Sequence, residues 1–507
     1  MNNPLFDALF APHEGSARPF LVLPDDSPVT YGDFFDLSGR VANALFRLGL
    51  QPGDRLAVVA PKSPMSLALY AGAVRAGVVL LPLNIAYTAA ELSYFLANSG
   101  AGAVVVEPSR AAELAPIAAE TGARLLTLDA GGKGTMTEAV AAEGSAFAMV
   151  PRADDDLAAL MYTSGTTGRS KGAMLTHANL LSNARVLAEA WRFTSDDVLL
   201  HALPVFHTHG LFVATNVALV AGASMILLPR FDVDDVLRWL PQATTMMGVP
   251  TYYTRLLADP RFDRSVTANM RLFTSGSAPL LAETHRRFEA RTGHRILERY
   301  GMTETNMNTS NPYDGERRPG TVGPPLPGVV LRVVDPKTGD PLPAGETGMI
   351  EVRGPNVFKG YWQMPERTAA EFRPDGFFIT GDLGFIDGDG YVTIVGRAKD
   401  LVISGGLNVY PKEIETVLDE MPGVAESAVI GVPHPDFGEA VVAVLARDGT
   451  TEPDIAAIER AAARRLAPFK RPKAWFVVDA LPRNTMGKVQ KNRLRDRFGD
   501  IFSAKAR

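Results

Sequence analysis

Strand-like and helix-like segments alternate through the first part of the chain, and this alternation is the feature that most constrains the fold. Residues 55–60 are apolar and β-branched like a buried strand, residues 64–75 have helical spacing, and residues 78–82 return to strand character. A strand, a helix and a second strand in this order form a βαβ unit with parallel strands. Residues 92–98 and 103–106 continue the rhythm. We therefore expect an α/β protein with layered sheets.

The residue composition and the pattern of strand-like segments change beyond Arg317. Before it, further strand-like segments recur with helix-length gaps, at residues 198–203, 224–228, 245–249 and 272–275. After it, Gly and Pro become dense, and alternating segments at residues 329–334 and 349–352 indicate short antiparallel strands. We expect the large N-terminal domain to combine layered α/β sheets with a β-barrel-like subdomain.

A second domain is expected toward the C-terminal end. Residues 390–395 resemble a closing strand, and a glycine pair follows nearby, which places a boundary near Lys399. We expect a large domain of residues 1–398 and a small, mobile α+β domain of residues 399–507. The small domain has a helix that opens with Pro411, a residue favoured in a first turn. Its strand-like segments are residues 424–432 and 440–446.

A loop rich in glycine and hydroxyl residues follows residues 157–162, which resemble a buried strand. The sequence TSGTTGRSKG at residues 163–172 offers backbone N–H groups, hydroxyl groups and the charge of a lysine to an anion. Its spacing differs from the Walker pattern. A flexible linker would have a similar composition, but the preceding strand favours a ligand site at a sheet edge. The loop residues expected to bind a nucleotide are Thr163, Ser164, Gly165, Thr166, Thr167, Gly168 and Lys171.

The composition excludes several classes of protein. The chain has no cysteine, which excludes disulfides, thiolate metal sites and a cysteine nucleophile. The formal net charge of −5 argues against general nucleic-acid binding. The apolar stretches are shorter than the roughly 18 residues that a membrane span needs, and the first residues lack a basic segment followed by an apolar core. We expect a cytoplasmic protein whose partners are small molecules.

Five further segments carry groups suited to a nucleotide and an acid. They are HALPVFHTHGL at residues 201–211, ERYGMTET at 298–305, TGD at 380–382, GRAKDLVISGGLNVYP at 396–411 and LPRNTMGKVQK at 481–491. The histidines of the first segment lack the acidic or cysteine partners of a metal site, so a pocket wall is expected there. The second segment supplies an aromatic ring, a glycine, a hydroxyl and a carboxylate suited to Mg²⁺. Each segment alone is compatible with ordinary structure.

Together, in this order and spacing, these segments resemble the adenylate-forming superfamily of acyl-CoA synthetases, luciferases and nonribosomal adenylation domains. The resemblance covers essentially the whole chain. It implies that a carboxylate attacks the α-phosphorus of MgATP to give an acyl-adenylate and pyrophosphate, and that the thiolate of coenzyme A then displaces AMP. The lack of cysteine is compatible with this reaction, because the intermediate is held noncovalently.

The resemblance also implies roles for particular residues. The loop that starts at Thr163 would hold the β- and γ-phosphates, and Thr303 would contact the α-phosphate. Glu304 would bind Mg²⁺, and Lys488 would bridge the carboxylate and the α-phosphate. The residues expected along adenine and ribose are Ser277, Ala278, Pro279, Glu298, Arg299, Tyr300, Gly301, Asp382 and Arg397. The residues expected to act in catalysis are Lys488, His207, Arg169, Thr303 and Glu304.

The small domain is expected to rotate about Lys399 between the two half-reactions. Rotation would withdraw Lys488 and bring Ser404, Gly405 and Gly406 toward the thiol of coenzyme A. Many relatives have aspartate where this chain has Lys399.

The acid is expected to be malonate. A second carboxylate on the substrate needs a cationic partner, ideally an arginine with its planar fork, and Arg255 in GVPTYYTR meets that need. A position on a surface helix is the alternative for this residue. The strings GVPTYYTRL and YGMTETNMNTS resemble malonyl-CoA synthetases, which bind malonate and often methylmalonate. The expected acid pocket consists of Arg255, Ser277, His207, Met302 and Met307.

Other functions stay open at this point. The protein could activate another short or aryl acid, load a carrier protein, or bind a nucleotide without catalysis. A carrier-loading domain normally sits beside a carrier domain, for which the residues after Lys488 leave no room. A noncatalytic module would need neither Lys488 nor a hinge.

Overall fold

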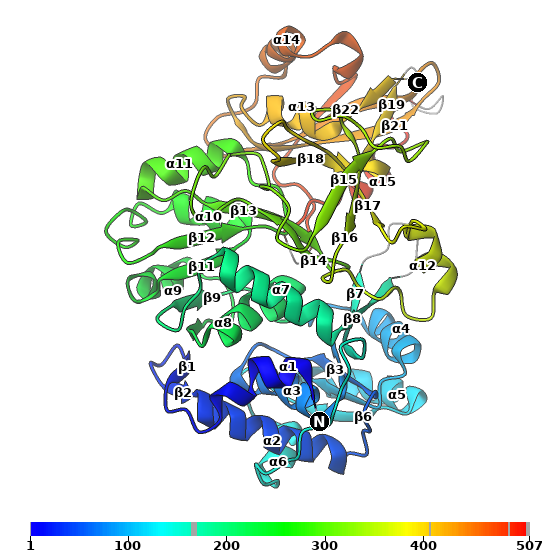
Figure 1. Ribbon diagram of the computed structural model, residues 1–507. Coiled ribbons are helices and arrows are strands. Elements are labelled where there is room, and N and C mark those ends of the chain that lie inside the picture. Colours follow the sequence, from blue (N-terminus) through cyan, green and yellow to red (C-terminus); the bar gives the residue numbers. More distant parts are fainter. Residues whose placement is uncertain (1, 164–169, 405–406, 485–486, 503–507) are drawn as a thin grey trace.

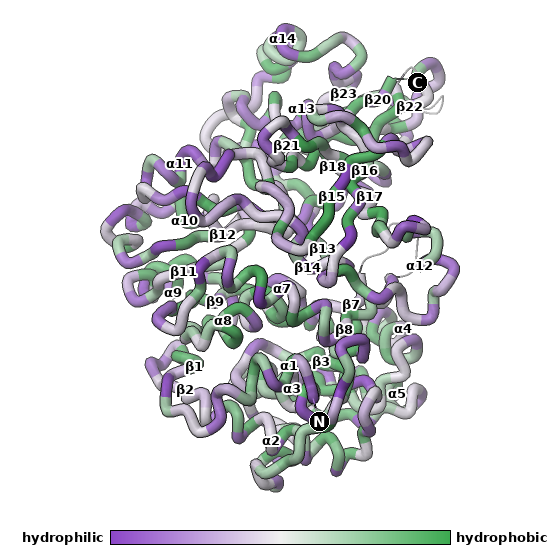
Figure 2. Tube along the Cα trace, in the orientation of Figure 1, coloured by the Kyte–Doolittle hydropathy of each residue, from purple (hydrophilic) through white to green (hydrophobic). Residues whose placement is uncertain are grey.

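The computed structural model describes residues 2–163, 170–404, 407–484 and 487–502. Two large sheets with their helices form the N-terminal part, and two smaller sheets lie toward the C-terminal end (Figure 1). The buried strands are mostly hydrophobic, whereas connecting turns and outer helices carry hydrophilic residues (Figure 2). No helix in the described part of the chain combines the length and apolar character needed to span a bilayer.

The first sheet has six strands in the order β6-β5-β3-β4-β7-β8, parallel except for the β7–β8 hairpin. Its strands are β3 (Arg55–Val59), β4 (Val79–Pro82), β5 (Ala103–Val106), β6 (Arg124–Thr127), β7 (Leu157–Thr163) and β8 (Lys171–Thr176). Its helices are α2 (Tyr31–Arg47), α3 (Pro64–Ala76), α4 (Ala89–Ser99), α5 (Ala111–Thr121) and α6 (Thr135–Ala141). The hydroxyl of Ser63 caps the start of α3, and Gly77 ends it in the left-handed conformation. The predicted βαβ unit is confirmed.

The second sheet has eight strands in the order β14-β13-β12-β11-β9-β10-β1-β2, with a parallel centre and an antiparallel pair at each end. Its strands are β1 (Pro19–Val22), β2 (Pro28–Thr30), β9 (Val198–His201), β10 (Ser224–Leu227), β11 (Thr245–Gly248), β12 (Leu272–Ser275), β13 (Leu297–Met302) and β14 (Asn306–Ser310). Its helices are α1 (Pro4–Leu9), α7 (His177–Ala190), α8 (Asn216–Ala221), α9 (Val233–Trp239), α10 (Pro250–Ala258) and α11 (Ala282–Thr292).

The two large sheets share one layer of helices. Leu56 and Val58 of β3 join a core that also contains α2, α3, α7 and strands of the second sheet. Ala57 and Val59 face the other way and pack under α4 and α5, because side chains alternate along a strand. The far face of the second sheet is covered by α9, α10 and α11. The large domain therefore consists of alternating layers of helix and sheet, as predicted.

The segment beyond Arg317 forms a four-stranded antiparallel sheet in the order β15-β16-β17-β18. Its strands are β15 (Val330–Val334), β16 (Gly348–Arg353), β17 (Phe378–Ile386) and β18 (Val392–Arg397), and α12 (Pro365–Glu371) precedes β17. The antiparallel strands were predicted, but the barrel-like closure was wrong. Within the described residues β15 does not pair with β18, because four short strands are too few to curve into a closed barrel.

The small C-terminal sheet is built around β22, which pairs with β21, β19 and β23. Its strands are β19 (Val402–Ser404), β20 (Leu407–Val409), β21 (Val424–His434), β22 (Gly438–Arg447) and β23 (Ala474–Val478). Helices α13 (Pro411–Leu418) and α14 (Ile455–Arg465) cover one face, and α15 (Lys491–Phe498) covers the other. The chain changes from one sheet to the next between Arg397 and Val402. The boundary at Lys399 falls in this interval and stays a prediction.

Candidate functional site

The β7–β8 hairpin holds the two ends of the glycine-rich loop together. Thr163 at the end of β7 pairs with Lys171 at the start of β8. Residues 360–362 pack along the β8 strand of this hairpin. The N–H of Trp362 donates to the carbonyl of Gly172 at 2.8 Å. Of the predicted loop residues, Ser164, Gly165, Thr166, Thr167, Gly168 and Arg169 lie outside the described residues.

Lys171 contacts a carboxylate and an aromatic ring. Its ammonium lies 3.0 Å from the carboxylate of Glu371 and 4.1 Å from the ring centroid of Tyr361. The Tyr361 hydroxyl lies 2.6 Å from the Glu371 carboxylate and 3.1 Å from that of Glu304. The loop lysine and the carboxylate predicted to bind Mg²⁺ are therefore linked through Tyr361 and Glu371.

The segment predicted to line adenine follows β12. Ser277 has φ of 68°, a left-handed conformation that is strained for any residue other than glycine. Ala278 is half-buried and Pro279 is exposed. The buried carboxylate of Glu298 accepts the N–H of Leu280 at 3.1 Å, and burial raises its pKa to about 8. Glu298 thus fixes the backbone of this segment.

A polar cluster consists of Asp382 in the middle of β17, Arg397 at the end of β18 and Tyr300 in β13. The Nε atom of Arg397 lies 2.7 Å from Oδ1 of Asp382, and the Tyr300 hydroxyl donates to Oδ2 at 2.6 Å. The charge of Asp382 raises the pKa of Arg397. A carboxylate held at both oxygens presents its remaining lone pairs in a fixed direction, which suits the hydroxyls of a ribose.

A close backbone contact in the β13–β14 hairpin positions Thr303 and Glu304. A Cβ atom at Gly301 would lie 1.8 Å from the carbonyl oxygen of Asn306, so only glycine fits there. Glu304 is buried, and burial raises its pKa. A nucleotide-bound Mg²⁺ takes one or two protein carboxylates together with phosphate oxygens and waters. Glu304 fits the role of one such ligand.

His207 and His209 lie beside Arg299. The main-chain N–H of His209 donates to Nδ1 of His207 at 3.2 Å, so the neutral His207 ring carries its proton on Nε2. Burial and the charges of Arg299 and Lys488 lower the pKa of His207 to about 4. His207 is therefore neutral at pH 7. Across the described residues, His, Asp and Glu side chains form no group of three that could hold a metal ion.

Arg299 is a buried cation beside these histidines. It is 2% exposed, and its guanidinium lies against Gly276, where an added Cβ would be 2.4 Å from Cζ. Its Nε and Nη2 atoms have no hydrogen-bond partner among the described residues. Burial lowers its pKa to about 9, which leaves it charged at neutral pH. A buried, unpaired charge is costly, so this guanidinium marks a place for an anion.

The other residues of the expected acid pocket differ in exposure. Met307 is buried, Met302 is half-buried, and the Ser277 hydroxyl lies 3.3 Å from Nδ1 of His209. Arg255, by contrast, is exposed on α10. This placement disfavours Arg255 as the partner of a buried carboxylate, because an exposed guanidinium is fully solvated and its ion pairs are weak.

The C-terminal part of the chain brings Lys488 to the site. The neighbouring Gly487 lies close to Thr251, at the start of α10: a Cβ at Gly487 would be 3.5 Å from the Thr251 hydroxyl oxygen. Lys488 remains exposed to solvent, but the protein around it and the charge of Arg397 lower its pKa. Its charge acts on the ring of His207. Lys488 therefore lies close enough to Arg397 and His207 for the charge at one residue to change the pKa of another.

Lys399, the predicted hinge, and Ser404, predicted to approach coenzyme A, lie where the chain changes from the β15–β18 sheet to the C-terminal sheet. Lys399 is part of a short 3-10 turn (Ala398–Asp400), and Asp400 pairs with Arg495 of α15 at 2.7 Å. Ser404 is buried at the end of β19. Gly405 and Gly406 lie outside the described residues.

The sequence matches the AMP-binding enzyme family over residues 11–362 and the C-terminal domain of AMP-binding enzymes over residues 413–488. The chain belongs to the AMP-binding enzymes. The predicted membership of the adenylate-forming superfamily is confirmed.

Solved structures and characterised relatives resemble this AMP-binding enzyme along almost its whole length. The ATP-bound crystal structure of MatB from Rhodopseudomonas palustris is 58% identical, with a TM-score of 0.97, and covers 99% of this chain and 100% of its own. The apo crystal structure of MatB gives a TM-score of 0.86. The malonate–CoA ligase of Arabidopsis thaliana is 35% identical over 97% of this chain and 88% of its own. The feruloyl-CoA synthase of an Amycolatopsis species is 38% identical over 98% of both.

Reasoning from sequence missed three residues of this AMP-binding enzyme: Tyr361, Glu371 and Lys62. The buried ammonium of Lys62 donates to the carbonyl oxygens of His201 at 2.7 Å and Leu203 at 3.0 Å, at the start of the segment that carries His207. Nothing in the sequence marks Lys62. For Glu371, the available signal was an arginine four residues earlier on the same short helix, a spacing typical of ion pairs.

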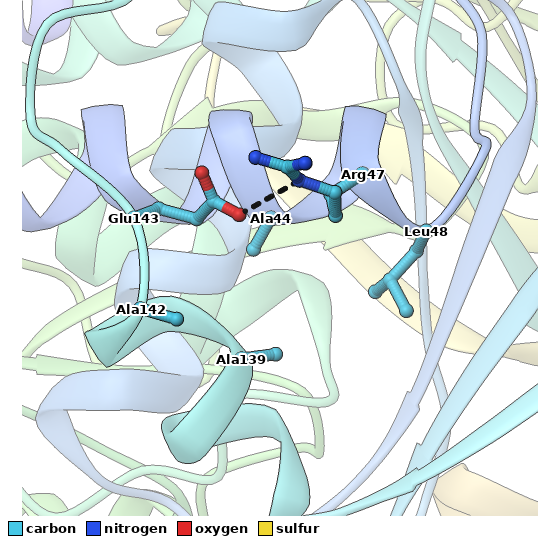
Figure 3. Close-up of a pocket in the computed structure, with 6 residues that line it drawn as sticks. All are labelled: Ala44, Arg47, Leu48, Ala139, Ala142 and Glu143. Atoms are coloured by element: carbon cyan, nitrogen blue, oxygen red, sulfur yellow. Dashed lines mark hydrogen bonds and ion pairs between the residues drawn. The ribbon is translucent and has the colours of Figure 1, made fainter.

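A shallow hollow on the surface of the enzyme lies between α2 and α6 (Figure 3). It is lined by Ala44, Arg47, Leu48, Ala139, Ala142 and Glu143. Both helices belong to the N-terminal end of the molecule, opposite the small domain (Figure 1). The hollow shares no residue with the site described above. The ion pair between Arg47 and Glu143 in its wall is 3.2 Å long, and the Arg47 side chain is exposed, so the charges there are solvated and offer a ligand little binding energy.

Proposed function

We propose that the protein joins malonate to coenzyme A in two steps. Malonate first attacks the α-phosphorus of ATP, which gives malonyl-adenylate and pyrophosphate. The thiolate of coenzyme A then attacks the acyl carbon and displaces AMP, which gives malonyl-CoA. Methylmalonate is the second acid included in this proposal, and a cytoplasmic location is part of it.

The observation that carries this proposal is the buried guanidinium of Arg299, whose Nε and Nη2 atoms have no hydrogen-bond partner among the described residues. Malonate keeps a free carboxylate after its other carboxylate has been activated, and that free group needs a charged partner. A planar guanidinium can bind a carboxylate through two parallel hydrogen bonds. The neighbouring Ser277 hydroxyl and the neutral ring of His207 supply further polar groups. A monoacid would leave the buried charge of Arg299 without a partner.

The relatives support the same acid. MatB is a malonyl-CoA synthetase, and the Arabidopsis thaliana relative is a malonate–CoA ligase. Because one relative is a feruloyl-CoA synthase, an aryl acid is the second candidate substrate. A bulky ring has no group that would neutralise Arg299, so we favour malonate.

The residues of the site divide the work of the first step. Lys171 would contact the terminal phosphates, and Thr303 and Lys488 the α-phosphate, where negative charge develops. Glu304 would hold Mg²⁺, which supplies charge neutralisation on the phosphates when it is bound. Asp382 and Arg397 would bind the ribose hydroxyls. Ser277 to Pro279, with Tyr300 and Gly301, would border the adenine.

The second step would follow a rotation of residues 399–507 about Lys399. The contact between Gly487 and Thr251 would break, and Lys488 would leave the α-phosphate. Ser404, at the end of β19, would move toward the thiol of coenzyme A. The similarity to the ATP-bound form of MatB supports the view that the present arrangement serves the first step.

The decisive experiment measures pyrophosphate release with ATP, Mg²⁺ and a panel of malonate, methylmalonate, butyrate and ferulate, each with and without coenzyme A. We expect malonate to give the highest kcat/KM, and malonyl-CoA to form only when coenzyme A is present. Faster turnover with ferulate or butyrate would contradict the choice of acid. Release of pyrophosphate without any thioester product would favour carrier loading, and no release with any acid would favour a noncatalytic role.

A further inference from the structure

Lys171 is held in place by other side chains of the protein. Its side chain is 13% exposed and that of Glu371 is 17% exposed, so both groups of the 3.0 Å ion pair are largely removed from water. The ring of Tyr361 lies under the ammonium at 4.1 Å. A lysine stem normally has many rotamers, and an ordered partner on one side with a ring on another restricts them.

Glu371 is itself tightly fixed. One carboxylate oxygen receives the Lys171 ammonium and lies 2.6 Å from Nη2 of Arg367, and the other accepts the hydroxyl of Tyr361 at 2.6 Å. Burial and the nearby carboxylates raise the pKa of Tyr361, so its hydroxyl remains a donor. At the end of α12, the ring of Phe372 stacks on Phe358 with centroids 5.6 Å apart. The carboxylate has little freedom to leave Lys171.

The backbone ties this group to the loop hairpin. Tyr361 bridges to Ala173 of β8, and Trp362 donates to the carbonyl of Gly172. The segment that carries Tyr361 therefore moves with the strand that carries Lys171. An ammonium group has three N–H donors, and a single bond to Glu371 leaves two of them for another acceptor.

We propose that Glu371, with the help of Tyr361, is a positioning residue that orients Lys171 toward the terminal phosphates of ATP. This inference rests on the proposed function, because it assigns a phosphate to the two remaining donors of Lys171. It means that the cost of ordering the lysine is met during folding rather than during nucleotide binding. Glu371 would keep its contact with Lys171 in the ATP complex.

The test compares Glu371→Gln with Glu366→Gln, a change of the same chemistry at an exposed position of the same helix. We expect Glu371→Gln to raise the Kd and the KM for ATP about tenfold and to leave the KM for malonate and for coenzyme A within about twofold. Glu366→Gln should match the wild type. In a Lys171→Met background, Glu371→Gln should add no further loss, because it acts through the lysine.

Tyr361→Phe provides a second variant that keeps the ring under Lys171 but removes the hydroxyl bond to Glu371. We expect a smaller rise in the KM for ATP, part of which should persist in the Lys171→Met background, because the Tyr361 hydroxyl also lies 3.1 Å from Glu304. Equal losses for all three substrates, tighter ATP binding by Glu371→Gln, or full additivity with Lys171→Met would each overturn the inference. If the wild type releases pyrophosphate with malonate and Glu371→Gln behaves like it, only this inference fails. If the wild type releases none with any acid, the proposed function fails as well.

Discussion

Burial, the charge of Arg299 and the charge of Lys488 together lower the pKa of His207, so Lys488 lies close enough to act on this ring. The two residues lie on different domains of the family, the AMP-binding region and its C-terminal domain. Their proximity supports the proposal that Lys488 acts in the step in which ATP and the acid react.

Lys488→Ala should lower the rate of adenylate formation by about 10²–10³, because one charge aimed at the developing phosphate charge is worth that much. Thioester formation from preformed malonyl-AMP should be nearly unchanged. Lys473→Ala, at an exposed position of the same domain, is the control. The two half-reactions are assayed separately by pyrophosphate release and by coenzyme A consumption. Equal losses in both would exclude the assigned role.

Arg299→Met should lower the kcat/KM for malonate by about 30- to several-thousand-fold, since a buried charge pair loses one member. Methionine keeps most of the volume, so butyrate should be used as well as before or better. Arg255→Leu, on the exposed side of α10, should change malonate kinetics by less than about twofold. Steady-state kinetics with both acids decides the matter. A large loss for Arg255→Leu with none for Arg299→Met would restore the original prediction from sequence.

Lys399→Pro should separate the two half-reactions. Proline fixes φ near −65°, which is compatible with the 3-10 turn that Lys399 occupies here. The variant should form the adenylate at close to the normal rate and fail to transfer the acyl group. Rapid-quench measurement of malonyl-AMP followed by addition of coenzyme A tests this. Normal overall turnover would show that the hinge lies at another residue.

Buried histidines should make the fold sensitive to mild acid. Burial lowers the pKa of His177 and of His285 to about 4. Between pH 6.5 and about 4 the unfolded chain binds protons that the folded chain does not, so the free energy of unfolding falls as the pH drops through this window and is unaffected above it. Each ring contributes up to about 1.4 kcal/mol per pH unit. His285→Leu should reduce this slope in denaturant titrations at several pH values, and an unchanged slope would contradict the assignment.

Local signals predicted the fold well. The spacing of apolar residues predicted a helix at residues 64–75, and the structure has α3 at Pro64–Ala76. The sequence predicted antiparallel strands at residues 329–334 and 349–352, but it could not show that the β15–β18 sheet stays open. Closure into a barrel depends on the number and curvature of the strands, whereas alternation of apolar residues indicates only that strands form. For the site, too, local sequence signals identify segments, whereas contacts between segments depend on the tertiary fold. A motif identifies a segment such as ERYGMTET, but only the tertiary fold shows that Gly276 leaves room for the side chain of Arg299.

Ser277 holds a conformation that most residues avoid, at the point where its hydroxyl meets His209. A left-handed backbone at a non-glycine residue costs on the order of 1 kcal/mol, and glycine would relieve it. Directed evolution that selects this enzyme only for heat tolerance would therefore favour Ser277→Gly, which removes the hydroxyl that contacts His209 and that we propose for binding the acid. A screen for a durable catalyst should score thermal survival and malonate turnover in the same round.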